Sequence, residues 1–236
     1  MNMSEMNSIN FNNIDSNIDM NLVIERFPII PSPSRNIYQV KVPGRSGSLT
    51  IDEGTYDDIE IPVIIGFQTT DFLNEKIKIK KWLYGTGGIL KLSVLPGVYF
   101  KVKNVSLPQF EEDVSTIQKF TVIFTCDPFK YRNEVKTTIT TINYKLNYSG
   151  TAEVKPLIKI TGSGDITLTV NNANVILKSV DAYITLDGEM EDAYKDTALQ
   201  NGKMNGEFPI LKPGENIIDF IGNVSKIEIT YIEAFL

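Results

Sequence analysis

Residues 36–42 alternate between polar and apolar side chains, with Tyr38, Val40 and Val42 on one side. A period of two is typical of a β-strand that buries one face. The next residues, Pro43-Gly44-Arg45-Ser46-Gly47-Ser48, contain two glycines that accept backbone angles other residues resist. We therefore predict a strand followed by a polar loop.

The same pattern predicts further strands on both sides of one helix. Residues 49–51 and 59–67 form a predicted strand pair, joined by an acidic turn at 52–54. Three more strands are predicted after the helix, at 89–95, 98–105 and 120–125, with Pro96-Gly97 as the hairpin turn between the first two.

The predicted helix spans residues 72–84, with Thr70 or Asp71 as its N-cap and Gly85 just beyond its end. Its apolar stripe comprises Leu73, Ile77 and Tyr84, with Phe72, Ile79 and Leu83 close by. For Trp82 we favour packing at the edge of the helix over ligand stacking.

After residue 155 the chain shows no helical period but has short apolar segments at even intervals. The predicted strands are 157–160, 166–170, 175–177, 182–186, 216–221 and 225–231. Strands spaced in this way close into a β-sandwich or jelly roll. The predicted fold class is therefore mainly β: an N-terminal β domain with one packed helix, then a C-terminal β-sandwich.

The distribution of charge supports a domain boundary near residue 148. Residues 1–148 carry 16 Lys+Arg and 16 Asp+Glu, whereas residues 149–236 carry 7 and 13. The whole net charge of -6 therefore belongs to the C-terminal part. Together with the polar stretch 147–151, this shift predicts two domains, 1–148 and 149–236.

Composition excludes several kinds of chemistry. The 236-residue chain has no histidine and one cysteine, Cys126. Ser-His-Asp and Cys-His catalysis need an imidazole, and one thiol cannot supply a zinc ligand set or an intrachain disulfide. We interpret Cys126 as a small buried hydrophobe rather than a nucleophile.

Paired carboxylates remain the only catalytic candidates. Acidic clusters occur at 52–53, 57–58, 111–113 and 187–192. A glycosidase needs two such groups facing each other across a cleft. Each cluster lies at a predicted turn, where solvated acids are common, and 187–192 lacks the EF-hand spacing for calcium. We therefore expect no enzyme activity, no metal site and no cofactor.

Nucleic-acid and membrane binding are also disfavoured. The net charge is negative, and the lysines at 76, 78, 80 and 81 go around the predicted helix instead of forming one basic face. No run of 18 apolar residues occurs, so we expect no membrane insertion. Residues 1–10 lack the basic and apolar regions of a signal peptide, so we expect synthesis in the cytoplasm.

The loop around Arg45 lacks the Gly-Lys-Ser/Thr ending of a phosphate-binding loop. We interpret Arg45 instead as a contact residue, either for a partner subunit or for a turn carboxylate such as Asp52.

Several short motifs occur in a characteristic order along nearly the whole chain. They are residues 21–33 (NLVIERFPIIPSP), 42–48 (VPGRSGS), 52–62 (DEGTYDDIEIP), 81–87 (KWLYGTG), 124–131 (FTCDPFKY), 184–189 (ITLDGE) and 208–216 (FPILKPGEN). In order and spacing they resemble the distal tail proteins (Dit) of phages, the tail-tip hubs of siphovirus-type tails. Ser46 departs from the acidic residue of the family pattern Pro-Gly-Arg-Asp-Gly.

The resemblance implies a tail-tube-like N-terminal domain that forms a hexameric ring, with DNA passing through its lumen without specific binding. It also implies a galectin-like or carbohydrate-binding-module-like C-terminal sandwich. The expected partners are the tail tube protein above and the tail-associated lysin, tail fibre or baseplate proteins below. In this picture the protein lies at the tail tip of the virion. Arg45, Ser46, Gly47 and Trp82 are candidate subunit-interface residues, with the helix from Phe72 as another interface element.

Two other functions remain open. A carbohydrate-binding adhesin would use residues of the C-terminal sandwich, with Tyr183 and Tyr194 as candidate contacts to cell-wall glycans. A glycosidase would use two facing carboxylates.

Overall fold

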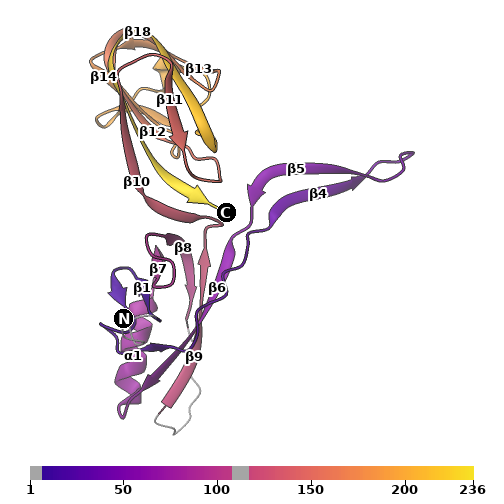
Figure 1. Cartoon of the computed structure of the whole chain (residues 1–236), viewed down its shortest axis with the longest axis vertical. Coiled ribbons are helices and arrows are strands. Elements are labelled where there is room, and N and C mark those ends of the chain that lie inside the picture. The colour runs from indigo at the N-terminus through magenta and orange to yellow at the C-terminus, as the bar shows by residue number, and fades with distance from the viewer. Residues whose placement is uncertain (1–6, 108–116) are drawn as a thin grey trace. The chain divides into compact units, whose positions relative to one another are not determined.

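The computed structural model describes residues 7–107 and 117–236, and it has two compact units. Unit 1 comprises residues 1–130 together with Leu236, and unit 2 comprises residues 131–235. Both are built mainly from antiparallel strands, and the helix predicted at 72–84 is the only α-helix in the described ranges (Figure 1). The predicted fold class, mainly β with one helix, is confirmed.

The units divide between Lys130 and Tyr131, ahead of the boundary that charge suggested at 148/149. The reason is packing. Ile139, Leu146 and Tyr148 are buried in the apolar core of unit 2, although residues 131–148 carry three basic residues and one acidic residue, unlike the acidic remainder of that unit. Charge is carried by surface residues, so it does not report which core a strand joins.

The body of unit 1 is a seven-stranded antiparallel sheet in the order β3-β6-β9-β8-β7-β1-β2. The strands are β1 (Ile9–Phe11), β2 (Ile14–Asp15), β3 (Val23–Ile24), β6 (Ile59–Gln68), β7 (Thr86–Leu92), β8 (Tyr99–Ser106) and β9 (Ile117–Cys126). The hairpin predicted around Pro96-Gly97 is present as β7 and β8. The short strands β1 and β2 were not predicted, because two or three residues are too few to show a period.

Strands β6 and β9 have a strict inside–outside alternation. In β6 the side chains of Ile61, Val63 and Ile65 are fully buried, and the residues between them face outward. In β9, Val122 and Phe124 face the same core, where the Phe124 ring meets Phe11 edge-on with centroids 5.3 Å apart. Their burial gives unit 1 a continuous apolar core.

Helix α1 (Phe72–Leu83) closes one side of this core. Asp71 is its N-cap, since its side chain accepts a hydrogen bond from the Asn74 backbone N–H. The predicted apolar stripe is only partly correct: Ile79 and Leu83 are buried, whereas Leu73, Ile77 and Tyr84 are exposed. A 12-residue helix with apolar residues over most of its circumference can bury only the side that meets the sheet.

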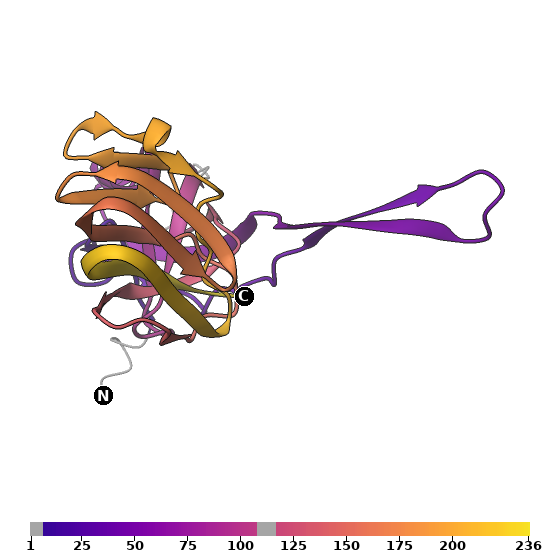
Figure 2. The ribbon, with the colours of Figure 1, turned by 90° about the horizontal axis from the view of Figure 1, so that it is seen from above.

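Strands β4 (Arg35–Lys41) and β5 (Ser48–Tyr56) form a separate two-stranded sheet, a hairpin that extends away from the body of unit 1 (Figures 1 and 2). Two sequence predictions are wrong here. Residues 52–54 lie inside β5 instead of forming a turn, and β5 pairs with β4 rather than with β6. Gly54 takes a positive φ of 72° within the strand. A glycine in the sequence marks a turn and an irregularity within a strand equally well, so the sequence alone does not distinguish them.

Unit 2 is a β-sandwich around its own core. Its elements are β10 (Lys130–Ile139), β11 (Tyr144–Tyr148), β12 (Leu157–Val170), β13 (Ala173–Val180), β14 (Tyr183–Asp187), β15 (Asp192–Lys195), β16 (Ala198–Leu199), the 3-10 turn η2 (Asn201–Lys203), β17 (Met204–Asn205) and β18 (Gly214–Phe235). Strands β12 and β18 are each one long strand where the sequence predicted two short ones. Each of them runs through both sheets of the sandwich.

Glycines explain why these long strands bend instead of stopping. The register between β12 and β18 shifts on both sides of Gly162 and Ser163. A Cβ atom on Gly162 would lie 2.3 Å from the Asn223 carbonyl oxygen, and one on Gly222 would lie 2.6 Å from that of Asp165. The two backbones therefore approach each other closely at a bulge, which redirects both strands from one sheet to the other.

Replacing Gly222 tests this account of the bend. Gly222→Ala should lower the free energy of unfolding by about 1–3 kcal/mol, because Gly222 also has a φ of 118° and its new Cβ meets backbone. Gly202→Ala is the matched control, since a Cβ added there would have open space within 4 Å and the φ of Gly202 is ordinary. Guanidinium chloride unfolding measures both, and equal midpoints for the two variants would contradict the close approach.

Candidate functional site: the projecting hairpin

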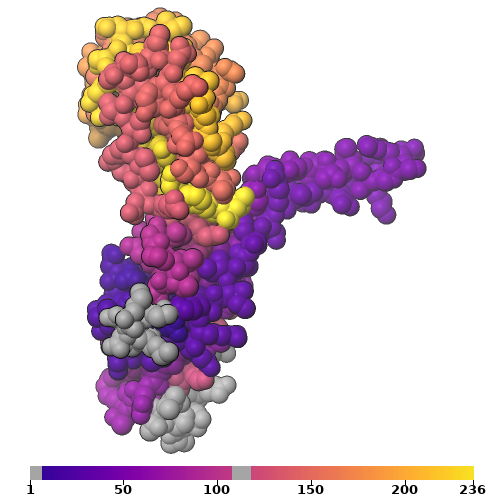
Figure 3. Space-filling view, viewed as in Figure 1, coloured from indigo at the N-terminus to yellow at the C-terminus, as the bar shows by residue number. Residues whose placement is uncertain are grey.

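The hairpin β4–β5 has one fully apolar face. Tyr38 lies opposite Ile51, and Val40 lies opposite Leu49, so these cross-strand pairs share one side of the ribbon with Val42. All five side chains are exposed, with 52% of Tyr38 accessible. The space-filling view shows the hairpin standing clear of the body of unit 1 (Figure 3).

The opposite face of the hairpin is mostly polar. Its cross-strand pairs are Ile37 with Asp52, Gln39 with Thr50, and Lys41 with Ser48. The ribbon is therefore amphipathic, but no other described element of its own unit buries its apolar side. Two-stranded hairpins are marginally stable in water, and a contiguous exposed apolar surface usually marks an interaction site.

The base of the hairpin is held by specific contacts. Arg35 forms a two-point ion pair with Asp52, with Nε–Oδ1 and Nη2–Oδ2 distances of 2.9 and 2.8 Å, and its guanidinium lies over the Tyr56 ring. The hydrogen bond from Arg35 holds the pKa of Asp52 below its ordinary value. Tyr56 in turn meets the Phe129 ring edge-on at 5.7 Å. These contacts orient the hairpin at its root.

The candidate interface residues Arg45, Ser46 and Gly47 form the exposed tip of the hairpin. Gly47 has a φ of 83° with open space around it, so glycine is needed here for the turn and not for close packing. Arg45 does not contact Asp52, whose carboxylate is already paired with Arg35. Contact of Arg45 with a partner subunit stays a prediction.

Trp82 has a different role from the tip residues. Its side chain is 7% accessible, and its indole N–H donates a 3.2 Å hydrogen bond to the Phe11 carbonyl. Trp82 therefore packs inside unit 1, as the packing interpretation predicted. It offers little surface to a second subunit.

The candidate glycan residues Tyr183 and Tyr194 lie on the outer face of one sheet of unit 2. Their strands are adjacent, and Tyr194 pairs with Thr185, two residues after Tyr183 on β14. The Tyr183 ring is already occupied: the ammonium groups of Lys159 and Lys195 lie 4.4 and 5.5 Å from its centroid. Its hydroxyl donates to Asp196, which raises the pKa of Tyr183. These contacts are those of a structural network, and none of them is directed at a ligand.

The acidic clusters do not come together into a catalytic or metal-binding site in the part of the chain that the structure describes. Asp52 and Asp58 are held in ion pairs with Arg35 and Lys103, and the backbone N–H groups of Glu189 and Met190 both donate to Asp187. No group of three or more acidic or thiol side chains is close enough there to hold a metal ion. The cluster at 111–113 lies outside the described residues. In the described ranges, no helix has the length and apolar character required to span a bilayer.

Sequence reasoning identified the tip of the hairpin but missed its apolar face. The alternation in 36–42 was visible, yet we expected such a strand to bury that face. The signal that could have revealed the hairpin is the matching alternation at 48–52 across a six-residue loop.

No family model and no curated protein matches the sequence. A match comes from solved structures: the crystal structure of Dit (gp 19.1) of phage SPP1, described as a paradigm of the hub adsorption apparatus in phages that infect Gram-positive hosts. The TM-score is 0.78 at 16% identity, with 98% of this chain and 99% of that chain covered. The fold resemblance to a phage distal tail hub protein that the sequence motifs implied is confirmed.

Burial makes Cys126 unreactive in the folded protein. Its side chain is fully buried at the end of β9, and desolvation raises the pKa of its thiol to about 12. Ellman's reagent at pH 8 should therefore detect no thiol in the native protein and one per chain in guanidinium chloride. Rapid labelling of the native protein would contradict the burial of Cys126.

Proposed function

We propose that this chain is a structural virion protein, a distal tail hub that joins the tail tube to the baseplate or tail-tip proteins of a siphovirus-type phage. The observation that carries this proposal is the match in fold over the full length of both chains to the SPP1 Dit protein. Both units are covered by the match, so it concerns the two-unit architecture and not a common β-sandwich alone.

In the proposed assembly, unit 1 forms a ring of six copies. The hairpin supports this part, because an apolar surface on a projecting element finds its partner on another molecule. A surface that fits a different surface of the same chain generates a head-to-tail contact, which closes into a ring when the rotation between copies permits. Arg45, Ser46 and Gly47 at the tip would then lie at the subunit interface.

Unit 2 is the proposed outward domain that carries the tail-associated lysin, fibre or baseplate proteins. The C-terminal region is acidic, with 13 acidic and 7 basic residues after position 148, which disfavours adhesion to DNA. Residues 1–130 carry 13 Lys+Arg and 15 Asp+Glu, and this near-balance of charge suits a ring whose lumen passes DNA without binding it. We assign the protein no catalytic role, because its neighbour in fold is a hub of an adsorption apparatus, and Asp52, Asp58 and Asp187 from three of the acidic clusters form ion pairs or turn contacts.

Labelling of phage particles tests the location. An antibody against unit 2 should bind at one end of the tail, distal to the capsid, in negative-stain images. Cryo-EM of the same tails should show six copies around the channel. An antibody signal at the capsid, or along the whole tail, would overturn the proposal.

A polar substitution on the apolar face of the hairpin tests its role in assembly. Val40→Asp combined with Leu49→Asp should abolish ring formation and incorporation into tails, while the unfolding midpoint stays near that of the parent because both residues are exposed. Gln39→Asp combined with Thr50→Asp is the matched control on the polar face. Equal assembly of the two double variants, measured by mass photometry and tail incorporation, would show that the apolar face is not an interface.

A further inference from the structure

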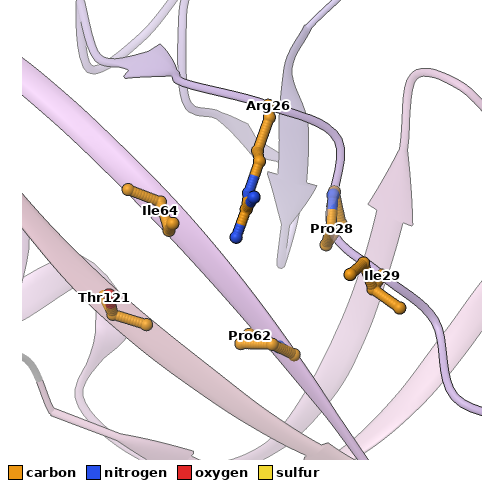
Figure 4. Close-up of a pocket in the computed structure, with 6 residues that line it drawn as sticks. All are labelled: Arg26, Pro28, Ile29, Pro62, Ile64 and Thr121. Atoms are coloured by element: carbon orange, nitrogen blue, oxygen red, sulfur yellow. The ribbon is translucent and has the colours of Figure 1, made fainter.

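A small pocket on the outer face of strand β6 offers little chemistry. Its walls come from the segment after β3 and from strands β6 and β9, and they consist of Arg26, Pro28, Ile29, Pro62, Ile64 and Thr121 (Figure 4). None of these side chains is a carboxylate, a thiol or an amide. Reactive groups are found instead along the backbone of unit 2.

Unit 2 contains both Asn-Gly pairs of the chain, Asn201-Gly202 and Asn205-Gly206. In such a pair the glycine backbone nitrogen attacks the carbon of the side-chain amide and closes a succinimide ring, while the amide nitrogen leaves as ammonia with the proton of the attacking N–H. Water then opens the ring to aspartate or to isoaspartate, in which the main chain runs through the former side chain. Glycine favours the attack because its backbone is the least restricted and no side chain obstructs the approach.

Asn201 is held at both ends of its side-chain amide. Its Oδ1 accepts a hydrogen bond from the Ala193 backbone N–H, and its Nδ2 donates to Asp192 Oδ1 at 2.9 Å. The surrounding turn η2 is fixed by backbone bonds from the Gln200 N–H to the Ala193 carbonyl and from the Lys203 N–H to the Gln200 carbonyl. Attack on the Asn201 amide requires hydrogen bonds of this network to break first.

Asn205 lacks these restraints. Both asparagines are exposed, but the side chain of Asn205 forms no hydrogen bond with any residue in 7–107 or 117–236. Asn205 ends β17, a two-residue strand that pairs with β13 and lies at the edge of its sheet. The ends of such short edge strands open locally at little cost in free energy. The backbone can therefore rotate at Asn205 and bring the Gly206 nitrogen to the side-chain amide.

The fold also requires a glycine after Asn205. Gly206 has a φ of 119°, and a Cβ added to it would lie 2.5 Å from the Asn174 carbonyl oxygen. A Cβ added to Gly202 would meet nothing within 4 Å. Packing thus excludes, at position 206, the side chains that would slow the attack.

The Asp-Gly pair of the chain, Asp187-Gly188, is restrained like Asn201. Asp187 Oδ1 accepts hydrogen bonds from the backbone N–H groups of Glu189 and Met190. The Gly188 N–H, which would be the attacking group, donates to the Pro156 carbonyl at 3.2 Å. Among the three pairs, Asn205-Gly206 is therefore the one whose reacting side chain is not held by a hydrogen bond.

We propose that Asn205 is a site of spontaneous modification, at which the folded protein converts asparagine to isoaspartate and aspartate while Asn201 stays intact. The reaction needs only water, so it goes beyond the proposed hub function and does not depend on it. Each conversion adds a negative charge to a unit that is already acidic. Isoaspartate also lengthens the main chain, which breaks the register of β17 with Ile176 and Leu177 on β13.

Peptide mapping of the full-length protein tests the site. Trypsin cleaves after Lys195 and Lys203, so the two asparagines fall into separate peptides, 196–203 and one that begins at Met204. After incubation of the native protein at pH 8, the peptide from Met204 should exchange its amide NH2 for OH about tenfold or more faster than 196–203. In guanidinium chloride the two rates should become similar. Equal rates in the native protein, or conversion of Asn205 in the unfolded chain alone, would overturn the proposal.

Release of Asn201 tests the reason for the difference. Asp192→Ala removes the acceptor of Asn201 Nδ2 and should raise the conversion of Asn201 about threefold or more, with Asn205 unchanged. Glu189→Ala is the matched control, an exposed acid of the same region without a bond to Asn201, and it should change neither rate. An unchanged rate at Asn201 in Asp192→Ala would show that this hydrogen bond does not protect it.

The effect on β17 is tested by separating charge from chain length. Asn205→Asp carries the added charge without the longer main chain, so its unfolding midpoint should stay near that of the parent. The isoaspartate form, purified by ion exchange from aged protein, should unfold at a lower concentration of guanidinium chloride. Aged Asn205→Gln should keep the parent midpoint, because the longer side chain closes the ring far more slowly. Equal midpoints for the isoaspartate form and Asn205→Asp would contradict the loss of β17 pairing.

Discussion

A two-stranded ribbon has no interior, so the hairpin β4–β5 cannot bury either of its faces by itself. Side chains on either face of β4–β5 remain in contact with water unless another surface covers them. The chain nevertheless places Tyr38, Val40, Leu49 and Ile51 together on one face. Such an arrangement costs free energy in the isolated chain and gains it when a partner buries the face. A surface that covers this face would therefore stabilise the hairpin.

The rest of unit 1 provides a rigid base for that element. The alternation in β6 and β9 builds a core that α1 closes with Ile79 and Leu83, and Trp82 is fixed to the backbone of β1. The Arg35–Asp52 ion pair and the Tyr56–Phe129 ring contact hold the root of the hairpin. A projecting arm can dock in one orientation only if its root is fixed, because a freely moving arm would lose more conformational entropy on binding.

In unit 2 the main structural feature is that two long strands contribute to both sheets of the sandwich. Strands β12 and β18 serve both sheets by bending at bulges, where glycines let the two backbones approach each other. Its last strand is tied to β11 by the buried Tyr148 hydroxyl, which accepts a hydrogen bond from the Ala234 N–H at 2.9 Å. The outer face of its sheet holds Tyr183 within a network of lysines and aspartates. These contacts stabilise unit 2 from within.

The sequence by itself determined the mainly β fold class, the position and N-cap of α1, the β7–β8 hairpin and the absence of histidine chemistry, because local periodicity, capping and composition decide these. Its ordered motifs also indicated the distal tail fold. Only the tertiary structure decided which periodic faces are buried. The alternation at Tyr38 and Val40 looks the same as that at Ile61 and Val63, yet the first pair is exposed and the second is in the core. Burial depends on which other element, in this chain or another, lies against a face, and a local pattern does not contain that information.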